Sequence, residues 1–146
     1  MSTPDKEASS QQADLEALVA QAIAIQPRAW APYSRFFVGA AVWGEGQVFS
    51  GVNVENASFG LTICAERAAI TAAVASGVTQ LTAVAVCTQT QASPPSSPCG
   101  ACRQVLREFA ADPRTFRVIA VNPDGARREW TLAELLPDSF SGAELP

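Results

Sequence analysis

The sequence predicts a single domain of the α/β class, and three observations support this. The chain has 146 residues, which fits one domain, and 48% of them are hydrophobic, which is enough to bury a core. Short apolar runs of strand length alternate with segments whose apolar residues recur at helical spacing. Because a strand–helix–strand order needs a crossover connection, we expect central strands that are mostly parallel.

A polar stretch opens the chain, and an amphipathic helix follows it. Residues 1–11 carry no apolar pattern, and we expect a flexible tail there, ahead of a single domain over residues 12–146. A helical pattern begins at Asp14, and Pro27 ends it. Its apolar face consists of Leu15, Leu18, Val19, Ala22 and Ile23.

Two strands and a second helix come next. The apolar run FFVGAAVW, residues 36–43, is typical of a strand that is buried on both faces. A glycine-containing turn at 44–46 and the segment 47–54 extend this run into a hairpin. The alanine-rich segment 64–76 predicts a helix that ends before Gly77.

The second half of the chain continues the alternation. The run LTAVAVCT, residues 81–88, predicts a buried strand, and a proline-rich loop leads from it to a helix over 100–111. The run FRVIAVN, 116–122, predicts another buried strand. A short strand near 127–130 and a helical turn at 132–136 complete a core with five strands.

Composition narrows the class of function. The net charge is −4 and only 16% of residues are charged, which argues against a surface for nucleic acid. No apolar run reaches the length of a membrane span, and the polar start MSTPDKEASSQQ lacks the core of a signal peptide. We therefore expect a cytoplasmic protein without membrane contact. The absence of histidine excludes histidine-based catalytic triads and zinc sites with an imidazole ligand.

Three of the four cysteines stand where helices are expected to begin. Cys99 and Cys102 form a C-x-x-C pair at a loop-to-helix junction, a spacing that lets both sulfurs face one ion. Cys64 begins the alanine-rich helix, and helix N-termini stabilise negative charge. Two such termini on one side of a sheet can bring the three thiols together. Because three thiolates with one open position are typical of catalytic zinc, we expect Zn²⁺ as the cofactor.

Charged residues beside the cysteines suggest how such a site would work. Glu66 lies two residues after Cys64, where a carboxylate can take a proton from a metal-activated water and hand it on. An ordinary first-turn glutamate, favoured by the helix dipole, is the alternative. Arg67 and Arg103 can offset the charge of three thiolates by hydrogen bonding to sulfur, or can be surface arginines in water.

Two other arrangements of the cysteines remain open. C-x-x-C is also the spacing of a redox pair, although PCGAC has no flanking aromatic residue here. Cys87 could be a fourth ligand, which would close the site and make it structural. Since Cys87 lies within an apolar run, we expect it instead to be a small buried hydrophobic residue.

The motifs CAER, residues 64–67, and PCGACRQ, residues 98–104, resemble those of the cytidine deaminases, in the small form that assembles as a homotetramer. Zinc deaminases share an H-x-E motif followed by P-C-x-x-C, and Cys64 stands in place of the histidine. The segments APYSRF, VGAA, NVENAS and ELLPDSF extend the resemblance from Ala31 to Phe140. It implies a three-layer α-β-α sandwich around a five-stranded mixed sheet.

The resemblance implies an activity and the residues for it. The expected reaction is hydrolytic deamination of cytidine and 2′-deoxycytidine to the uridines, with release of ammonia, as in pyrimidine salvage. Zinc would be held by Cys64, Cys99 and Cys102. A water activated by the zinc would supply the new oxygen, and Glu66 would be the proton shuttle.

The resemblance also implies contacts with a nucleoside. Asn53 and Glu55 correspond to residues that hydrogen-bond the ribose hydroxyls, and Phe36 corresponds to an aromatic residue that stacks on the pyrimidine. Backbone groups at Ala65 and near Cys99 would contact the base. Without the resemblance, Asn53 and Glu55 could equally be solvated turn residues, and Phe36 a core residue.

Contacts between subunits are implied as well. Phe140 corresponds to an aromatic residue that reaches the site of a neighbouring subunit, and Tyr33 corresponds to a residue at subunit contacts. Phe59 departs from the family pattern, in which tyrosine is frequent at this position. The ring is kept here, and the hydrogen bond of the hydroxyl at a subunit contact is lost.

Three alternatives to this function follow from the same residues. One is a deaminase of a cytosine-nucleoside antibiotic, of the blasticidin S type, although NVENAS favours a plain nucleoside. Deamination of nucleic acid is disfavoured by the acidic chain and by the lack of long loops. The third is a non-enzymatic zinc module with four cysteine ligands, which requires Cys87 at the metal.

Overall fold

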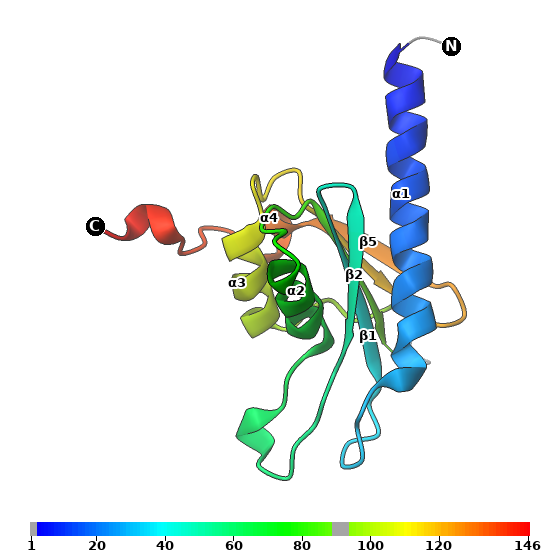
Figure 1. Cartoon of the computed structure of the whole chain (residues 1–146), viewed down its shortest axis with the longest axis vertical. Coiled ribbons are helices and arrows are strands. Elements are labelled where there is room, and N and C mark those ends of the chain that lie inside the picture. Colours follow the sequence, from blue (N-terminus) through cyan, green and yellow to red (C-terminus); the bar gives the residue numbers. More distant parts are fainter. Residues whose placement is uncertain (1–2, 89–93) are drawn as a thin grey trace.

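A five-stranded sheet forms the centre of the molecule (Figure 1). The structure is a computed structural model that describes residues 3–88 and 94–146. The strands lie in the order β2-β1-β3-β4-β5. They are β1 (Val38–Gly44), β2 (Gln47–Val52), β3 (Ala83–Thr88), β4 (Arg117–Val121) and β5 (Arg127–Thr131). The helices are α1 (Thr3–Ile25), α2 (Ala65–Ala75), α3 (Gly100–Phe109) and α4 (Leu132–Leu135), with 3₁₀ turns at Gln26–Arg28, Phe59–Leu61 and Gly142–Glu144.

The expected elements are all present, and their ends agree with the sequence to within two residues, except at the start of α1. Residues 89–93 of the proline-rich loop lie outside the described part of the chain. The direction of one strand differs from the expectation. Among the described strands, only β3 and β4 pair in parallel, whereas β1 runs antiparallel to both β2 and β3, and β4 to β5.

The position of β1 explains this difference. Helix α2 joins β2 to β3 and α3 joins β3 to β4, and each pair of joined strands runs in one direction, as crossover connections require. However, β1 lies between β2 and β3 and opposes both. The expectation of mostly parallel central strands is therefore wrong. The mixed sheet that the resemblance implies is confirmed.

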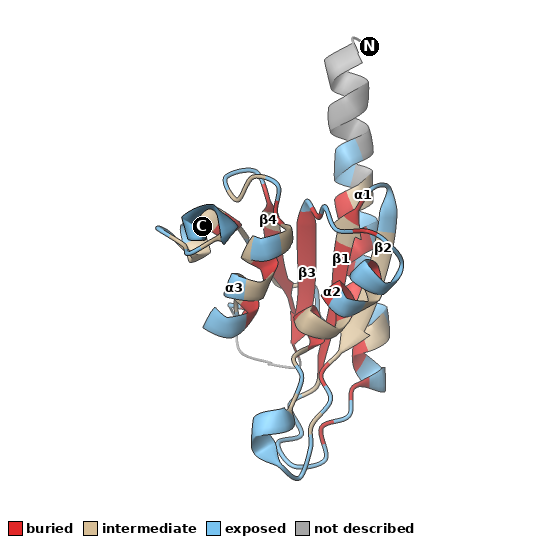
Figure 2. Ribbon diagram, turned by 60° about the vertical axis from the view of Figure 1, so that its left-hand side comes forward, coloured by how far each residue is buried: buried red, intermediate tan, exposed pale blue. Residues whose placement is uncertain are grey.

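Helices cover both faces of this sheet, which makes the expected three-layer sandwich (Figures 1 and 2). Since side chains alternate along a strand, β3 sends Val84 and Val86 to one face and Ala85 and Cys87 to the other. The first face packs against α2 and α3, and the second against α1. The apolar face expected for α1 is confirmed, because its residues pack on the sheet: Leu15, Leu18, Val19, Ala22 and Ile23.

Helix α1 begins earlier than the apolar pattern. Residues 3–11, expected to be a flexible tail, are helical and continue α1 beyond the end of the sheet (Figure 1). Lysine, glutamate, alanine and glutamine favour helix even without an apolar face to bury, and four residues of the segment are of these types: Lys6, Glu7, Ala8 and Gln11. A domain boundary near residue 12 stays a prediction. Across residues 3–88 and 94–146, no helix, α1 included, has the length and apolar character needed to cross a membrane.

Helix α2 lies unusually close to strand β2. A side-chain carbon at Gly51 of β2 would lie 2.8 Å from the carbonyl oxygen of Ala65, inside the normal contact distance. The residues of α2 that face the sheet are small, Ala65, Ala69 and Ala73, and all are fully buried. Glycine on the strand and alanine on the helix thus let the two backbones touch. This contact sets the height of the first turn of α2 above the sheet.

Candidate metal centre and adjoining pocket

Two helices begin at the same place above the sheet, and each begins with a cysteine. Cys64 is the N-cap of α2, with extended backbone (φ −73°, ψ 152°), and Cys99 is the N-cap of α3 (φ −64°, ψ 161°). Neither sulfur accepts a capping hydrogen bond from its helix. Both thiols are therefore free to face a ligand, next to the unpaired N–H groups of two first turns.

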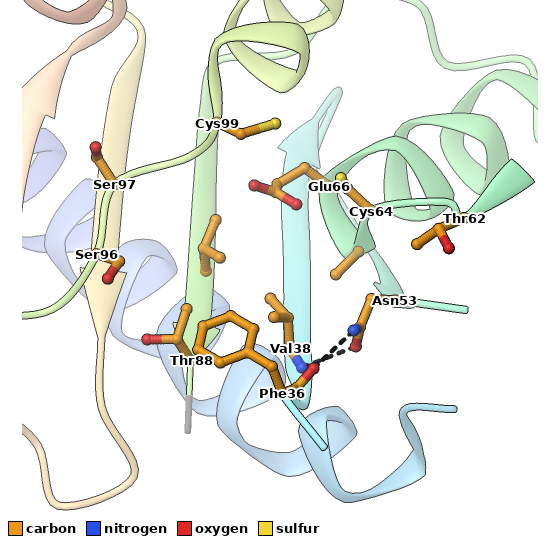
Figure 3. Close-up of a pocket in the computed structure, with 12 residues that line it drawn as sticks. Phe36, Val38, Asn53, Thr62, Cys64, Glu66, Thr88, Ser96, Ser97 and Cys99 are labelled. Atoms are coloured by element: carbon orange, nitrogen blue, oxygen red, sulfur yellow. Dashed lines mark hydrogen bonds between the residues drawn. The ribbon is translucent and has the colours of Figure 1, made fainter. Parts of the chain in front are cut away.

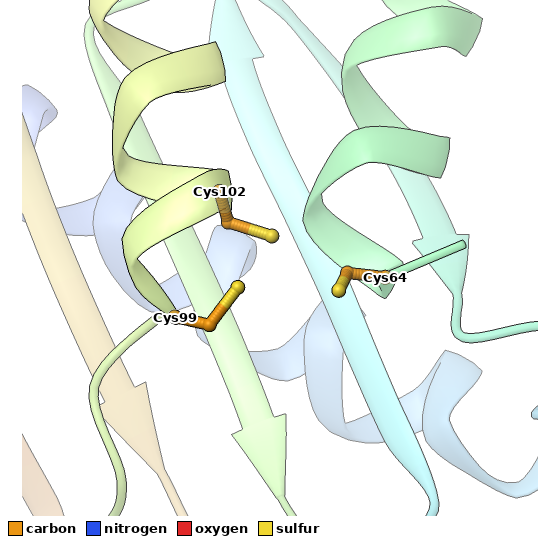
Figure 4. A group of neighbouring side chains, drawn as sticks. All are labelled: Cys64, Cys99 and Cys102. Carbon is orange, nitrogen blue, oxygen red and sulfur yellow. The ribbon is translucent and has the colours of Figure 1, made fainter. Parts of the chain in front are cut away.

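Cys102, one turn into α3, completes a cluster of three thiols (Figure 4). Among the described residues, these cysteines are the one group of potential ligands close enough to share an ion, with all sulfurs within 4.8 Å of one another. Zinc–sulfur bonds of about 2.3 Å in a tetrahedral site separate the sulfurs by about 3.8 Å. Small adjustments suffice for that geometry. The three cysteines predicted from sequence therefore meet.

The cluster is already biased towards negative charge. The Cys102 hydrogen bond, helped by Arg67, lowers the pKa of the Cys64 thiol to about 5, against the opposing effect of burial. The pKa of Cys102 is raised in turn, because its thiol donates to Cys64 and is buried. Arg67 Nη2 donates to the Cys64 sulfur at 3.6 Å and to the Thr62 carbonyl at 3.3 Å. A thiolate beside a guanidinium, with two more thiols in reach, is a donor set that fits Zn²⁺.

Arg103 does not make the sulfur contact that the sequence suggested. Its Nε donates to the Pro98 carbonyl at 2.7 Å, Nη1 to the Leu135 carbonyl at 2.9 Å, and Nη2 to the Ser97 hydroxyl at 2.8 Å. All three acceptors are oxygens around the loop that leads into α3. With these acceptors, the guanidinium braces the loop and does not donate to the sulfurs.

Glu66 is buried, although it occupies a first helical turn. Its side chain is only 5% exposed and lies beside Cys64 and Cys99, facing the same cavity (Figure 3). Burial raises the pKa of its carboxyl group, and the charge on Cys64 raises it further. Such a carboxyl group holds a proton more readily than a surface glutamate does. Its burial distinguishes Glu66 from the ordinary first-turn residue that was the alternative.

The cavity below the thiols has a volume of about 220 Å³. Phe36 forms one wall and is 40% exposed, so the alternative that it is a core residue is wrong. Ala65 lines the cavity at the first residue of α2. Sequence reasoning missed several polar residues on its walls, since their places depend on the folded loops: Thr62, Thr88, Ser96 and Ser97.

Asn53 holds the wall that carries Phe36. Its Oδ1 accepts from the Val38 N–H at 2.9 Å, and its Nδ2 donates to the Phe36 carbonyl at 2.8 Å (Figure 3). The amide side chain thus continues the β1–β2 ladder beyond Val52. An amide has two N–H groups and two lone pairs on its oxygen, so one of each remains for a ligand. The side chain is buried and lines the cavity.

Glu55 lies in a second cavity, of about 330 Å³, that shares Thr62 with the first. Its carboxylate accepts from the Ser34 hydroxyl and from the N–H groups of Tyr33, at 2.9 Å, and Ser34, at 3.2 Å. The Ser34 hydroxyl, more than the backbone N–H groups, lowers the pKa of Glu55. An elongated ligand with its flat end at the thiols would extend towards this carboxylate.

The other predicted residues are exposed. Phe140 is 59% exposed on the C-terminal segment, which leads away from the body of the molecule (Figure 1), and its carbonyl accepts from Gln104 at 3.0 Å. Tyr33 and Phe59 lie edge to face, with ring centroids 5.7 Å apart. Rings so exposed on one chain suit contacts with another chain.

Cys87 lies on the opposite face of the sheet from the three thiols. It is fully buried among the residues that pack against α1, and burial raises its pKa to about 11. It cannot be a fourth ligand, because the sheet separates it from the cluster. The alternative of a closed site with four cysteines is therefore wrong, and the interpretation of Cys87 as a core residue is confirmed.

Comparison with known proteins agrees with this arrangement. Residues 12–118 match the family described as the cytidine and deoxycytidylate deaminase zinc-binding region. The chain is 43% identical over 133 residues to the cytidine deaminase of Sporosarcina psychrophila, covering 90% of this chain and 95% of that protein. A crystal structure of cytidine deaminase from Burkholderia pseudomallei superposes with a TM-score of 0.78 at 45% identity, covering 86% of this chain and 98% of that one.

A second solved structure gives the same result. Cytidine deaminase from Mycobacterium tuberculosis superposes with a TM-score of 0.72 at 39% identity, over 87% of this chain and 97% of that one. The matched residues include the starts of both α2 and α3. Sequence, fold and thiol cluster agree, and the chain belongs to the zinc-dependent cytidine and deoxycytidylate deaminase family.

Proposed function

We propose that this protein catalyses the hydrolytic deamination of cytidine and 2′-deoxycytidine to uridine and 2′-deoxyuridine, with release of ammonia. The observation that carries the proposal is the meeting of three thiols and a buried carboxyl group at one cavity. The similar proteins are cytidine deaminases, which supports the choice of substrate. Such a reaction returns cytosine nucleosides to the uridine pool, as in pyrimidine salvage in the cytoplasm.

Cys64, Cys99 and Cys102 would hold the zinc. Zinc held in this way supplies Lewis-acid activation of a water molecule, which becomes a nucleophile near neutral pH. Arg67 reduces the excess negative charge of three thiolates by donating to the Cys64 sulfur. The N–H groups of the two first turns lower the energy of that charge further.

Glu66 moves the protons. Its carboxylate takes the proton of the attacking water and delivers it to N3 of the base, which makes C4 more electrophilic. It then takes the remaining proton from the new hydroxyl on C4 and transfers it to the amino group, so that the carbon–nitrogen bond at C4 breaks and ammonia leaves in place of an amide ion. Its raised pKa suits this work, because the carboxyl group must hold each proton between two transfers.

The walls of the cavities position the nucleoside. Phe36 stacks on the pyrimidine, and the backbone at Ala65 and Cys99 hydrogen-bonds its edge. The free N–H and lone pair of Asn53 and the carboxylate of Glu55 bind the ribose hydroxyls. Glu55 would exchange its hydrogen bond from the Ser34 hydroxyl for one from the ribose, since a sugar hydroxyl is the same kind of donor.

A homotetramer would complete the site. Several large apolar side chains between residues 30 and 63 and at the C-terminus are exposed, which is unfavourable for a monomer in water: Trp30, Tyr33, Phe36, Phe59, Leu61, Ile63 and Phe140. Phe140 would enter the site of a neighbouring subunit. Gel filtration with light scattering on the purified protein measures the mass of the assembly, and a monomer would contradict this part of the proposal.

A spectrophotometric assay tests the activity. We expect cytidine and 2′-deoxycytidine to be converted by the purified protein, and a chelator to abolish turnover until zinc is restored. Blasticidin S, offered at the same concentration, should react far more slowly. Turnover of blasticidin S alone would indicate an antibiotic deaminase. Turnover of none of the three compounds would reject the proposal.

A further inference from the structure

Arg103 links the loop in front of the thiol cluster to a distant part of the chain. We propose that Arg103 is a positioning residue, which fixes Cys99 and the cavity wall at Ser97 by tying their loop to the end of α4. The inference rests on the proposed function in one respect, since it assumes that the cluster binds zinc. It adds a determinant of the metal site that touches neither the metal nor the substrate.

Arg103 makes three hydrogen bonds that hold the loop. The guanidinium is partly buried and donates in three directions, to the Pro98 carbonyl (2.7 Å), the Ser97 hydroxyl (2.8 Å) and the Leu135 carbonyl (2.9 Å). The first two acceptors come directly before Cys99 in the chain. The third is a carbonyl at the end of α4, 32 residues after Arg103 in the chain, and such carbonyls lack a partner within their own helix.

The loop gains from this brace because two of its residues cannot donate backbone hydrogen bonds. Pro98 has no N–H group, and neither does Pro95, so neither residue can donate a backbone hydrogen bond. Cys99 itself is exposed, so packing does little to fix its position. A rigid planar group with donors on several edges can hold such a loop from one side, which a lysine ammonium on a flexible stem does poorly.

Arg107 offers a matched control on the same helix. It lies one turn beyond Arg103, is also partly buried, and its Nε donates to the Ser139 hydroxyl at 3.1 Å. It therefore ties α3 to the C-terminal segment, whereas Arg103 bonds to the end of α4, and it makes no bond to the Ser97–Cys99 loop. Removing either arginine takes one positive charge from the same helix. Only the removal of Arg103 would free the Ser97–Cys99 loop to move.

Metal release into a chromogenic chelator tests the inference. Zinc-loaded wild type, Arg103→Met, Arg103→Lys and Arg107→Met would be mixed with excess 4-(2-pyridylazo)resorcinol, and thermal unfolding would be followed by circular dichroism. We expect Arg103→Met to release zinc about 10-fold faster than wild type, which matches the lower end of the affinity lost when partners of metal ligands are removed, because Arg103 acts on the loop and on no ligand sulfur. Arg103→Lys should lie between the two, and Arg107→Met should release zinc at the wild-type rate.

Cobalt substitution adds a spectroscopic measurement. The thiolate-to-cobalt absorption bands should shift in Arg103→Met and remain unchanged in Arg107→Met, even where the two variants unfold at the same temperature. If Arg103→Met fails to fold, Ser97→Ala removes a single acceptor and Arg103→Lys keeps the charge. Both should still release zinc faster than wild type.

The outcomes separate this inference from the proposed function. Equal zinc release and equal cobalt spectra in the Arg103 and Arg107 variants would overturn the positioning role, whatever their stability. Wild-type release in both Ser97→Ala and Arg103→Lys would do the same. A wild-type protein that holds no zinc would instead reject the proposed function, and with it this inference.

Discussion

The starts of α2 and α3 have the same two residue types, a cysteine and an arginine, but the arginines make different contacts. Each has a cysteine at its N-cap in extended conformation, and each has an arginine in the next turn. Arg67 of α2 reaches back to the sulfur of its own N-cap. Arg103 of α3 bonds only to oxygens, as far as the described residues show.

The difference follows from what precedes each helix. The segment before Cys64 is tied by a backbone bridge between Val54 and Ile63, so Arg67 can donate to the Cys64 sulfur in addition to its one bond to the Thr62 carbonyl. The segment before Cys99 is rich in proline, and its arginine is needed to hold the backbone. One arginine tunes the thiolates, and the other places them. Four changes test this division.

The largest effect is expected from the ligand set. Cys102→Ala should lose zinc and turnover together, because two thiolates from different helices cannot retain the ion as three do. Zinc content by atomic absorption and the cytidine assay measure both. Full zinc content in this variant would show that the two helix starts do not form one site.

Glu66→Gln is expected to separate catalysis from metal binding. The amide fills the same space and cannot carry the proton, so turnover should fall by about 10²- to 10⁴-fold. Zinc content should stay at the wild-type level, since Glu66 is not a ligand. Near-normal turnover would reject the role of proton shuttle.

Arg67→Gln should weaken zinc binding moderately. Loss of the donor to Cys64 leaves the thiolates with uncompensated charge, and affinity for zinc should fall by about 10- to 100-fold. Competition with a chelator of known affinity gives the value. Unlike the Arg103 variants, this one should leave the Ser97–Cys99 loop in place. Limited proteolysis can compare the rate of cleavage in this loop between the variants. An unchanged zinc affinity would remove the proposed role of Arg67.

The smallest effect is expected from Cys87→Ala. The change opens a small void on the α1 side of the sheet, and the free energy of unfolding should fall by about 1 kcal/mol, which urea unfolding can measure. Zinc content and turnover should not change. Loss of zinc would contradict the separation of Cys87 from the cluster by the sheet.

Local features of this structure could be predicted from the sequence. The helices, the strands and the two cysteine N-caps follow from periodicity and from the residues that begin and end helices, which act over a few positions. The meeting of the three thiols also followed, because consecutive crossover helices begin at the same edge of a sheet. The place of Glu66 beside the cluster was expected as well, whereas its burial came only with the structure.

Features that depend on distant partners could not be predicted. The insertion of β1 between β2 and β3 is a choice of strand order, which no local pattern encodes. The bonds of Arg103 depend on Leu135, and a long flexible side chain has many partners within reach before the fold is known. The two hydrogen bonds that Asn53 makes with the backbone of Val38 and Phe36 likewise form only once the ends of the hairpin are in register.

The contact between Gly51 and α2 has a consequence for how the sequence can vary. Atoms of the main chain have no rotamers, so the spacing between this helix and the sheet does not adjust when neighbouring core residues change. Substitutions elsewhere in the core can be absorbed by repacking around α2, while its first turn keeps its height. The large hydrophobic residues of the chain can therefore change while Cys64 and Glu66 keep their positions.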